Sequence, residues 1–120
     1  MEDLSFTGLT TLRRLTLRST SYYDVLTFER GILYEALSTI QSPFFYELVF
    51  EVLGRLPQKS FRFDFGTWMG IDMFLGERWA EREDCRLIFR MEEVNGREIF
   101  ERHIMDRFPR LRERGRIHFE

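Results

Sequence analysis

The side chains best suited to catalysis or metal binding in this chain are one cysteine and two histidines. A thiol beside an imidazole can act as a nucleophile, and both groups are common zinc ligands. Cys85, His103 and His118 do not stand at ligand spacings such as C-x-x-C or H-x-x-x-H. We therefore expect structural or surface roles for them, with no metal and no cofactor.

A second candidate site is the segment Gly54–Ser60, which reads G-R-L-P-Q-K-S. The phosphate-binding pattern G-x-x-x-x-G-K-[ST] needs a second glycine and holds phosphate with backbone amides. This segment lacks that glycine, is one residue short, and Pro57 removes an amide. The sequence favours a connecting loop here.

Carboxylates also cluster, at Glu81, Glu83 and Asp84, but arginines are interleaved with them. Paired catalytic carboxylates face each other across a cleft with pKa values driven apart, whereas a cluster of mixed sign is typical of solvated surface. Since none of these patterns predicts a catalytic centre, we expect a protein that is not an enzyme.

The strongest local charge feature is a run of arginines near the C-terminus. Its members are Arg107, Arg110, Arg112, Arg114 and Arg116. Such a run could contact phosphates. The net charge of −2, from 18 basic and 20 acidic residues, provides no global attraction for polyanions. Nucleic acid is therefore disfavoured as a partner, and an anionic protein is favoured over it.

Length and composition indicate a single globular domain spanning residues 1–120. Apolar residues make up 43% and charged residues 32% of the chain, which excludes a disordered composition. One cysteine cannot form an internal disulfide, the N-terminus is acidic, and no apolar run is long enough to cross a bilayer. We expect an intracellular protein, cytoplasmic or nuclear, with no membrane partner.

Four segments of the chain share an apolar spacing in which two large apolar residues stand two apart. These segments are Leu12–Leu17, Phe45–Phe50, Asp84–Phe89 and Arg114–Phe119. Alternation with period two predicts a strand in each, with the paired residues on one face. The apolar pairs are separated by about 30 to 40 residues, which suits a parallel crossover through a helix.

Helical spacing fills the three gaps between the predicted strands. The first gap carries an apolar stripe of Ile32, Leu33, Ala36, Leu37 and Ile40, the second one of Trp68, Ile71, Phe74, Leu75 and Trp79, and the third one of Phe100, Ile104 and Phe108. In the third gap, Asn95–Glu98 predicts an N-cap with a capping-box acid, and Pro109 is expected to end the helix. The predicted order alternates strand and helix throughout.

Two α/β architectures fit this order: a solenoid segment with every helix on one side, and a compact doubly wound sheet with helices on both. Strands buried on both faces read as continuous apolar runs. Here the positions alternating with the apolar pairs are largely charged, so one face is expected to be exposed. We predict four parallel strands with three crossover helices on one side.

The same residues carry a resemblance to a known family. L-x-x-L-x-L strands followed by helices resemble leucine-rich repeats. Further matching elements, in order, are the Ser-Pro within Ile40–Pro43, the strand Phe45–Val52, the W-x-x-I-D-x-x-L helix Trp68–Leu75, the strand Arg86–Arg90 and the F-P-x-L-x-x-R-G segment Phe108–Gly115. Together they look like the C-terminal region of the F-box and leucine-rich-repeat proteins abundant in mushroom-forming fungi. The resemblance implies a protein-binding scaffold, or a fragment of a longer repeat array.

No F-box stands before the first strand, so recruitment to a ubiquitin-ligase adaptor is not implied.

The predicted function is non-catalytic protein binding through the exposed face of the parallel sheet. The residues expected there are Arg14, Thr16, Arg18, Glu47, Val49, Glu51, Arg86, Ile88, Arg90, Arg116 and His118. Charge pairs would select the partner, and Val49 and Ile88 would supply an apolar centre. The alternative is a doubly wound domain that binds a small molecule at the carboxyl ends of its strands. Unpaired outer strands also predict a homo-oligomer formed through the sheet edges.

Overall fold

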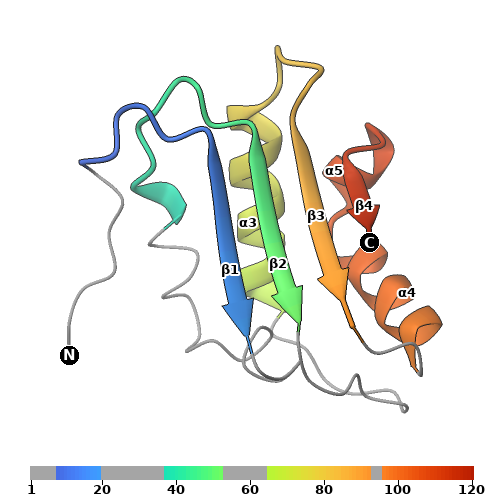
Figure 1. Ribbon diagram of the computed structural model, residues 1–120. Coiled ribbons are helices and arrows are strands. Elements are labelled where there is room, and N and C mark those ends of the chain that lie inside the picture. Colours follow the sequence, from blue (N-terminus) through green and yellow to red (C-terminus); the bar gives the residue numbers. More distant parts are fainter. Residues whose placement is uncertain (1–7, 20–36, 53–64, 93–95) are drawn as a thin grey trace.

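The computed structural model describes residues 8–19, 37–52, 65–92 and 96–120. Within them, four parallel strands form one sheet in unbroken chain order (Figure 1). The strands are β1 (Arg14–Ser19), β2 (Glu47–Val52), β3 (Arg86–Met91) and β4 (Ile117–Phe119). The expected parallel and sequential sheet is therefore confirmed.

The register matches the apolar pairs of the sequence. Leu15, Leu48, Leu87 and Ile117 stand side by side across the sheet, as do Leu17, Phe50, Phe89 and Phe119. The first three strands begin two residues later than the pattern predicted, and in the first two cases a turn reaches the first residue of the predicted segment. The N–H of Leu12 points back to the carbonyl of Leu9, for example, and the N–H of Phe45 to the carbonyl of Ser42.

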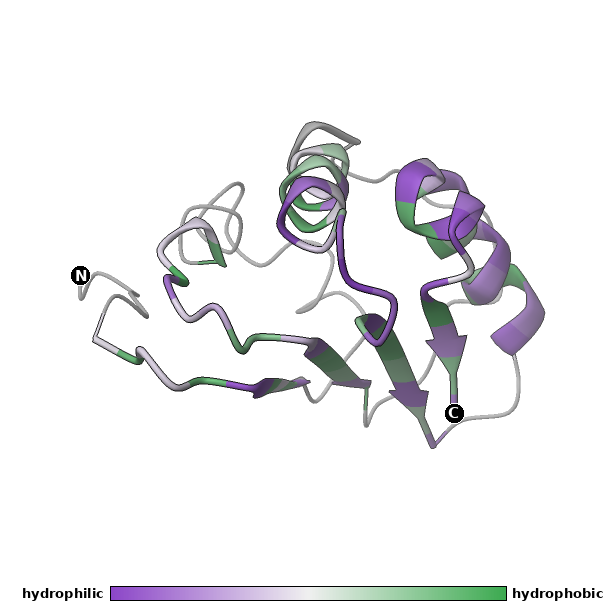
Figure 2. Cartoon of the chain, turned by 90° about the horizontal axis from the view of Figure 1, so that it is seen from above, coloured by the Kyte–Doolittle hydropathy of each residue, from purple (hydrophilic) through white to green (hydrophobic). Residues whose placement is uncertain are grey.

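In the described part of the two later crossovers, three helices cover one side of the sheet. They are α3 (Phe65–Arg78), between β2 and β3, and α4 (Arg97–Arg107) and α5 (Pro109–Glu113), between β3 and β4. Figure 2 shows them above the strands, with none of the described helices on the opposite side. The expected placement on one side thus holds for the described helices. A doubly wound sheet would need helices on both sides and a reversal of strand order, so the alternative architecture is disfavoured.

The core between sheet and helices is rich in aromatic rings. Phe89 stacks on Phe50 and Phe119, with ring centroids 5.3 and 5.9 Å apart. Trp68 on α3 meets Phe50 edge-on, and Phe100 on α4 meets Phe89 in the same way. Because the in-register phenylalanines form a continuous row, each ring is held by the rings of neighbouring strands.

The helical stripes behave largely as predicted. Trp68, Ile71 and Leu75 are buried on α3, and Phe100 and Ile104 are buried on α4. The stripe of the first gap is described only at its end, where Leu37 and Ile40 are buried. Ile32, Leu33, Ala36 and the segment Gly54–Ser60 lie outside the described residues.

Of two predictions about helix ends, the N-cap of α4 is wrong, whereas the end of α4 just before Pro109 is confirmed. The N-cap of α4 is Gly96, with φ of 81°, and no side-chain cap bond forms, so the capping box predicted from Asn95–Glu98 is absent at the described cap. Pro109 follows the first helix of this crossover but also begins a second one, α5. Proline is well suited to the first helical position because its missing N–H has no intrahelical partner there.

Candidate functional site

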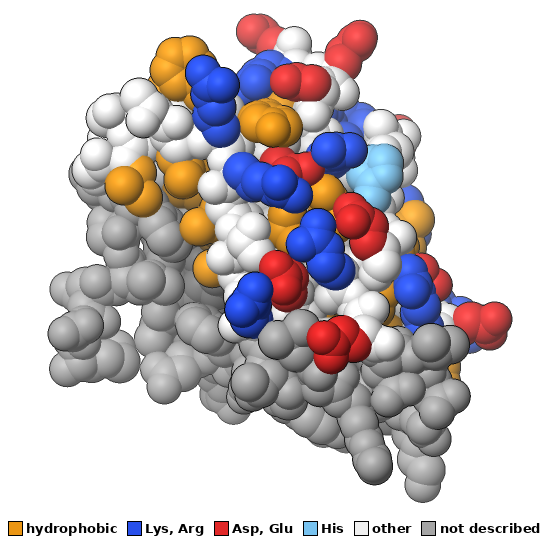
Figure 3. All heavy atoms as spheres, in the orientation of Figure 1, with side chains coloured by type: hydrophobic (Ala, Val, Ile, Leu, Met, Phe, Trp, Pro, Cys, Tyr) orange, Lys and Arg blue, Asp and Glu red, His pale blue; other side chains and the backbone are white. Residues whose placement is uncertain are grey.

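The candidate site is the sheet face turned away from the helices. Since the four strands are parallel and in register, alternate residues form three rows across this face. We call it the open face, and it comprises Arg14, Thr16, Arg18, Glu47, Val49, Glu51, Arg86, Ile88, Arg90 and His118, together with Glu120 just after β4. Figure 3 shows basic and acidic side chains alternating over these strands.

The first row centres on a buried glutamate. The side chain of Glu47 is 1% exposed, and its two carboxylate oxygens take one arginine each: Arg14 Nε from β1 and Arg86 Nε, at 2.7 Å, from β3. Both arginines are half-exposed. Within the described part of the chain, no hydrogen bond engages the Nη nitrogens of either arginine. Two guanidinium groups thus converge on one carboxylate with their outer donors available.

The third row repeats this motif in looser form. Glu51 lies between Arg18 Nε at 3.4 Å and Arg90 Nη1 at 3.5 Å, and Arg90 Nη2 lies 3.4 Å from Glu120. The Glu51 side chain is 13% exposed, so water screens these pairs more than those of Glu47. The row therefore alternates in sign across all four strands.

The middle row corrects one prediction. Thr16 and His118 are exposed as expected, but Val49 and Ile88 are only 0% and 1% exposed. The two apolar residues lie outside the core cluster that faces the helices. Rows of arginine and glutamate flank them, and the aliphatic stems of arginine commonly cover apolar surface in this way. The prediction of an exposed apolar centre on this face is therefore wrong, and the accessible surface is polar. The predicted exposure of Glu47 is also wrong, since its side chain is buried beneath its two arginines.

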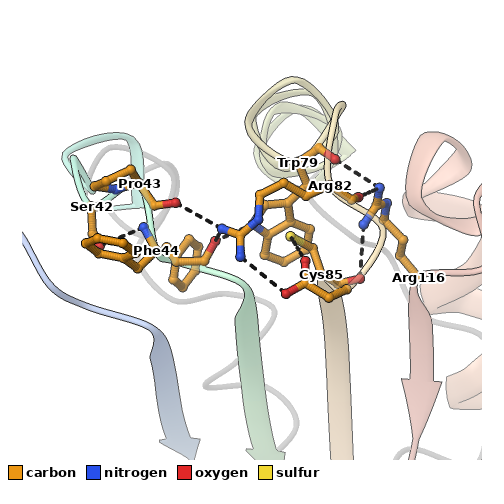
Figure 4. A network of polar contacts seen from close by, with 9 residues as sticks. Ser42, Pro43, Phe44, Trp79, Arg82, Cys85 and Arg116 are labelled. Carbon is orange, nitrogen blue, oxygen red and sulfur yellow. Dashed lines mark hydrogen bonds and ion pairs between the residues drawn. The ribbon is translucent and has the colours of Figure 1, made fainter.

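The prediction for Arg116 is also corrected, because its side chain is buried instead of lying on the open face. Its Nη1 donates to the carbonyl of Cys85 at 3.1 Å, and its Nη2 donates to the carbonyls of Trp79, at 2.9 Å, and Arg82. Figure 4 shows the guanidinium reaching into the loop between α3 and β3. The role of Arg116 is to hold that loop against the start of β4.

Other side chains extend this network along the loops that precede the strands (Figure 4). Arg82 Nη1 donates to the carbonyls of Pro43 and Phe45, at 3.0 and 3.2 Å. Ser42 Oγ donates to the carbonyl of Leu12 at 2.7 Å, and Trp79 Nε1 donates to that of Phe45 at 3.1 Å. We call these contacts, together with those of Arg116, the loop network. It satisfies carbonyls that no strand partner reaches.

The C-terminal arginines do not form one patch. Arg107 is buried, Arg112 lies 3.9 Å from Asp106, and Arg114 donates to the carbonyl of Ala80 at 2.8 Å. With Arg116 buried as well, the run is divided between the helix ends and the loop network.

Sequence reasoning missed a structural role for Asp72 on α3. Its carboxylate is buried and accepts the backbone N–H groups of Arg110 and Leu111, both at 3.0 Å. These are the second and third residues of α5, whose own N-cap, Phe108, provides no side-chain cap bond. Burial raises the pKa of Asp72, while the two N–H donors oppose that rise. The aspartate in the W-x-x-I-D motif, inside a helix with its neighbours apolar, was the available signal.

The cysteine and the histidines stand on separate elements. Cys85 is buried, and burial raises the pKa of its thiol, which disfavours the nucleophilic thiolate. His103 lies on α4, where partial burial lowers its pKa and Arg107 adds to that effect. Among the described residues, no cluster of three His, Cys, Asp or Glu side chains is placed to hold a metal ion.

Comparisons with known proteins provide no neighbour for this chain. No family model, no curated protein and no solved structure matches it. Likewise, none of the helices in the described segments has the length and apolarity that crossing a bilayer requires.

Proposed function

We propose that this chain is a non-catalytic protein-binding scaffold that takes its partner on the open face. We interpret residues 1–120 as one leucine-rich-repeat-like solenoid segment. Sequential parallel strands with the described helices on a single side support this interpretation. A sheet covered on one side leaves its other side for a partner, and each strand adds one stripe to that surface.

The observation that carries the proposal is the geometry of the first row. Arg14 and Arg86 bind Glu47 through Nε, which fixes the planes of their guanidinium groups and leaves the Nη donors directed elsewhere. A guanidinium whose orientation is already fixed loses less entropy when it binds a second carboxylate. The partner that suits this surface is a protein segment carrying Asp or Glu side chains.

A photo-crosslinking experiment tests the surface. A photoreactive residue is placed at Thr16 or at His118, both exposed on the open face, and in a control at Arg102, exposed on α4. Labelling is carried out in extract of the source cells, and the crosslinked peptides are sequenced. We expect acidic peptides of one partner from the open-face positions and none of them from position 102. Equal labelling from all three positions would contradict the proposal.

The captured partner then allows a test of the arginines. Arg14→Lys keeps the positive charge but loses the fork of donors, and Arg102→Lys is the matched control on the helix side. We expect the affinity to fall about tenfold or more for the first variant and to stay unchanged for the second. An Arg14→Lys variant with full affinity would exclude the guanidinium as a recognition group.

A further inference from the structure

The two edges of the sheet have backbone groups of defined direction. In a parallel ladder, alternate residues bond to opposite sides of their strand. Arg116 and Glu120, which flank β4, bond to Leu87, Phe89 and Met91 of β3. Ile117 and Phe119 therefore direct their N–H and C=O groups away from β3, toward the outer edge.

The same reasoning applies to the opposite edge. The carbonyl of Arg13 accepts the N–H groups of Tyr46 and Glu47, which belong to β2 and the residue before it. By alternation, Arg14, Thr16 and Arg18 direct their backbone groups outward. Among the described residues, none is hydrogen-bonded to β1 or β4 on those outer sides.

These two edges fit one another when the register of the sheet is simply continued. Placing Leu15 of a second copy beside Ile117 puts Leu17 beside Phe119, and all four side chains are only partly buried in the single chain. The outward backbone groups then face one another as a parallel ladder requires. Ile117 stands opposite Leu15 of the second copy, so its N–H and C=O groups face the outward groups of Arg14 and Thr16 of that copy. The match therefore holds for hydrogen bonds and apolar packing together.

Charge matches along the third row in this register, while in the first row Arg14 of the second copy would stand beside Arg116, whose side chain is turned away into the loop network. The third row already alternates as Arg18, Glu51, Arg90 and Glu120, and the next residue along it would be Arg18 of the second copy. Arg18 and Glu120 are both exposed, so they can form the additional pair. In contrast, an antiparallel pairing of two β1 edges centred on Thr16 would set Arg14 against Arg18 twice, and like charges directly opposite are destabilising.

We propose that β4 of one copy accepts β1 of a second copy as a parallel, in-register fifth strand. This inference does not depend on the open face being a binding surface. Because the two contacting edges differ, the contact is heterologous and produces a series of growing oligomers unless the curvature closes a ring. The occupant of the β4 edge is thus another copy of this chain.

The first test removes one outward donor. In Thr16→Pro the lost N–H is one that points away from β2, so the ladder to β2 keeps its bonds while the ring blocks the edge. Thr16→Val keeps the N–H and is the matched control. Sedimentation over a concentration series should show the mass rising for the wild type and for Thr16→Val, and a monomer for Thr16→Pro. A wild type that stays monomeric throughout, or a proline variant that associates equally, would overturn the proposal.

The second test examines polarity. Ile117→Pro blocks the β4 edge in the same way, with Ile117→Val as its control. Each proline variant alone should be monomeric, but a mixture of the two should form a dimer that does not grow, since Thr16→Pro retains a free β4 edge and Ile117→Pro a free β1 edge. A mixture that stays monomeric, or one that grows beyond the dimer, would contradict the β4-to-β1 contact.

Charge reversal provides a test that does not need proline. Arg18→Glu and Glu120→Arg should each weaken self-association about tenfold, and mixing the two variants should restore it, because opposite charges then meet at the shared edge. Protection of the buried Cys85 thiol from a thiol reagent shows in every variant that the fold is intact. Folded reversal variants that associate as the wild type does, or that fail to rescue each other, would exclude this register.

Discussion

At the scale of single residues, two glutamates on one strand have the same side chain and the same kind of partners but differ in burial. Glu47 and Glu51 both lie between two arginines on β2, but Glu47 is 1% exposed and Glu51 is 13% exposed. Removing the counterpart of a buried charge costs more folding free energy than removing that of an exposed charge, since water cannot replace the lost interaction. The two positions therefore form an internal comparison of the same side chain.

We predict that Glu47→Ala lowers the free energy of unfolding by about 3 kcal/mol, and Glu51→Ala by about 1 kcal/mol or less. Removing Glu47 leaves the Nε groups of Arg14 and Arg86 facing each other without an acceptor. Urea denaturation measures both values. Added salt should reduce the effect at Glu51 more than that at Glu47. Equal losses for the two variants would show that burial does not distinguish the two rows.

At the scale of elements, α5 depends on a residue of another helix. Asp72 on α3 accepts the N–H groups of Arg110 and Leu111, which a short helix beginning with Pro109 cannot satisfy internally. The side chain thus acts as a cap supplied from a distant part of the chain. It also ties α5 to α3, which lie side by side over the sheet.

We predict that Asp72→Ala lowers the free energy of unfolding by about 2 kcal/mol at neutral pH, since two N–H groups lose their acceptor. The pH dependence follows from the raised pKa of Asp72. The folded state holds the proton more tightly than the unfolded state, so the stability of the wild type relative to Asp72→Asn falls as pH rises from 3.8 through the raised pKa. Urea titrations of the wild type and Asp72→Asn at several pH values measure this difference. A difference that grows with pH would reverse the sign and refute the assignment.

The turn between α5 and β4 provides a second element-scale prediction. Gly115 has a φ of 66°, a left-handed conformation, and a Cβ there would meet nothing within 4 Å. We predict that Gly115→Ala lowers the free energy of unfolding by about 1–2 kcal/mol through backbone strain alone.

Gly76 on α3 is the matched control for this prediction. Its φ is that of a helix, and a Cβ would lie 3.4 Å from Cδ of Arg110, a flexible side chain. Because alanine favours a helix over glycine, Gly76→Ala should raise the free energy of unfolding by up to about 1 kcal/mol. Calorimetric melting of both variants should show opposite shifts in Tm. A loss of stability in both would place the cause in packing and not in backbone conformation.

At the scale of the whole molecule, the loop network connects the loops that precede successive strands. Arg82 joins the loop before β3 to that before β2, and Arg116 joins the start of β4 to the loop before β3. Arginine suits this role because its five donors reach several carbonyls at fixed angles. The strands are thus held in order both by the ladder and by side chains at their N-terminal ends.

We predict that Arg116→Lys lowers the free energy of unfolding by about 2 kcal/mol, because an ammonium group cannot reach the carbonyls of Trp79, Arg82 and Cys85 together. Arg114→Lys, at an exposed arginine with one carbonyl partner, should cost less than about 0.5 kcal/mol. Guanidinium unfolding measures both. Similar small losses for the two variants would show that Arg116 is not essential to the loop network.

The order of the strands and the inward apolar pairs were predictable from the sequence alone. Period-two alternation at Leu48 and Phe50, or at Leu87 and Phe89, is a local property of the chain, and it determines which side chains share a face. The gaps between the strands were too long for hairpins and suited parallel crossovers through a helix. The apolar stripe of α3 was readable for the same reason, since a helix repeats every 3.6 residues.

Only the tertiary structure decided which residues of the open face meet water. Arg116 follows the same alternation as Arg14 and Arg86, but carbonyls of a loop some thirty residues earlier in the chain hold it inside. Val49 and Ile88 are placed on the open face by register, and they are buried there between charged rows of neighbouring strands. Exposure depends on atoms contributed by distant segments, so periodicity assigns a side chain to a face while the packing of other strands decides whether it remains accessible.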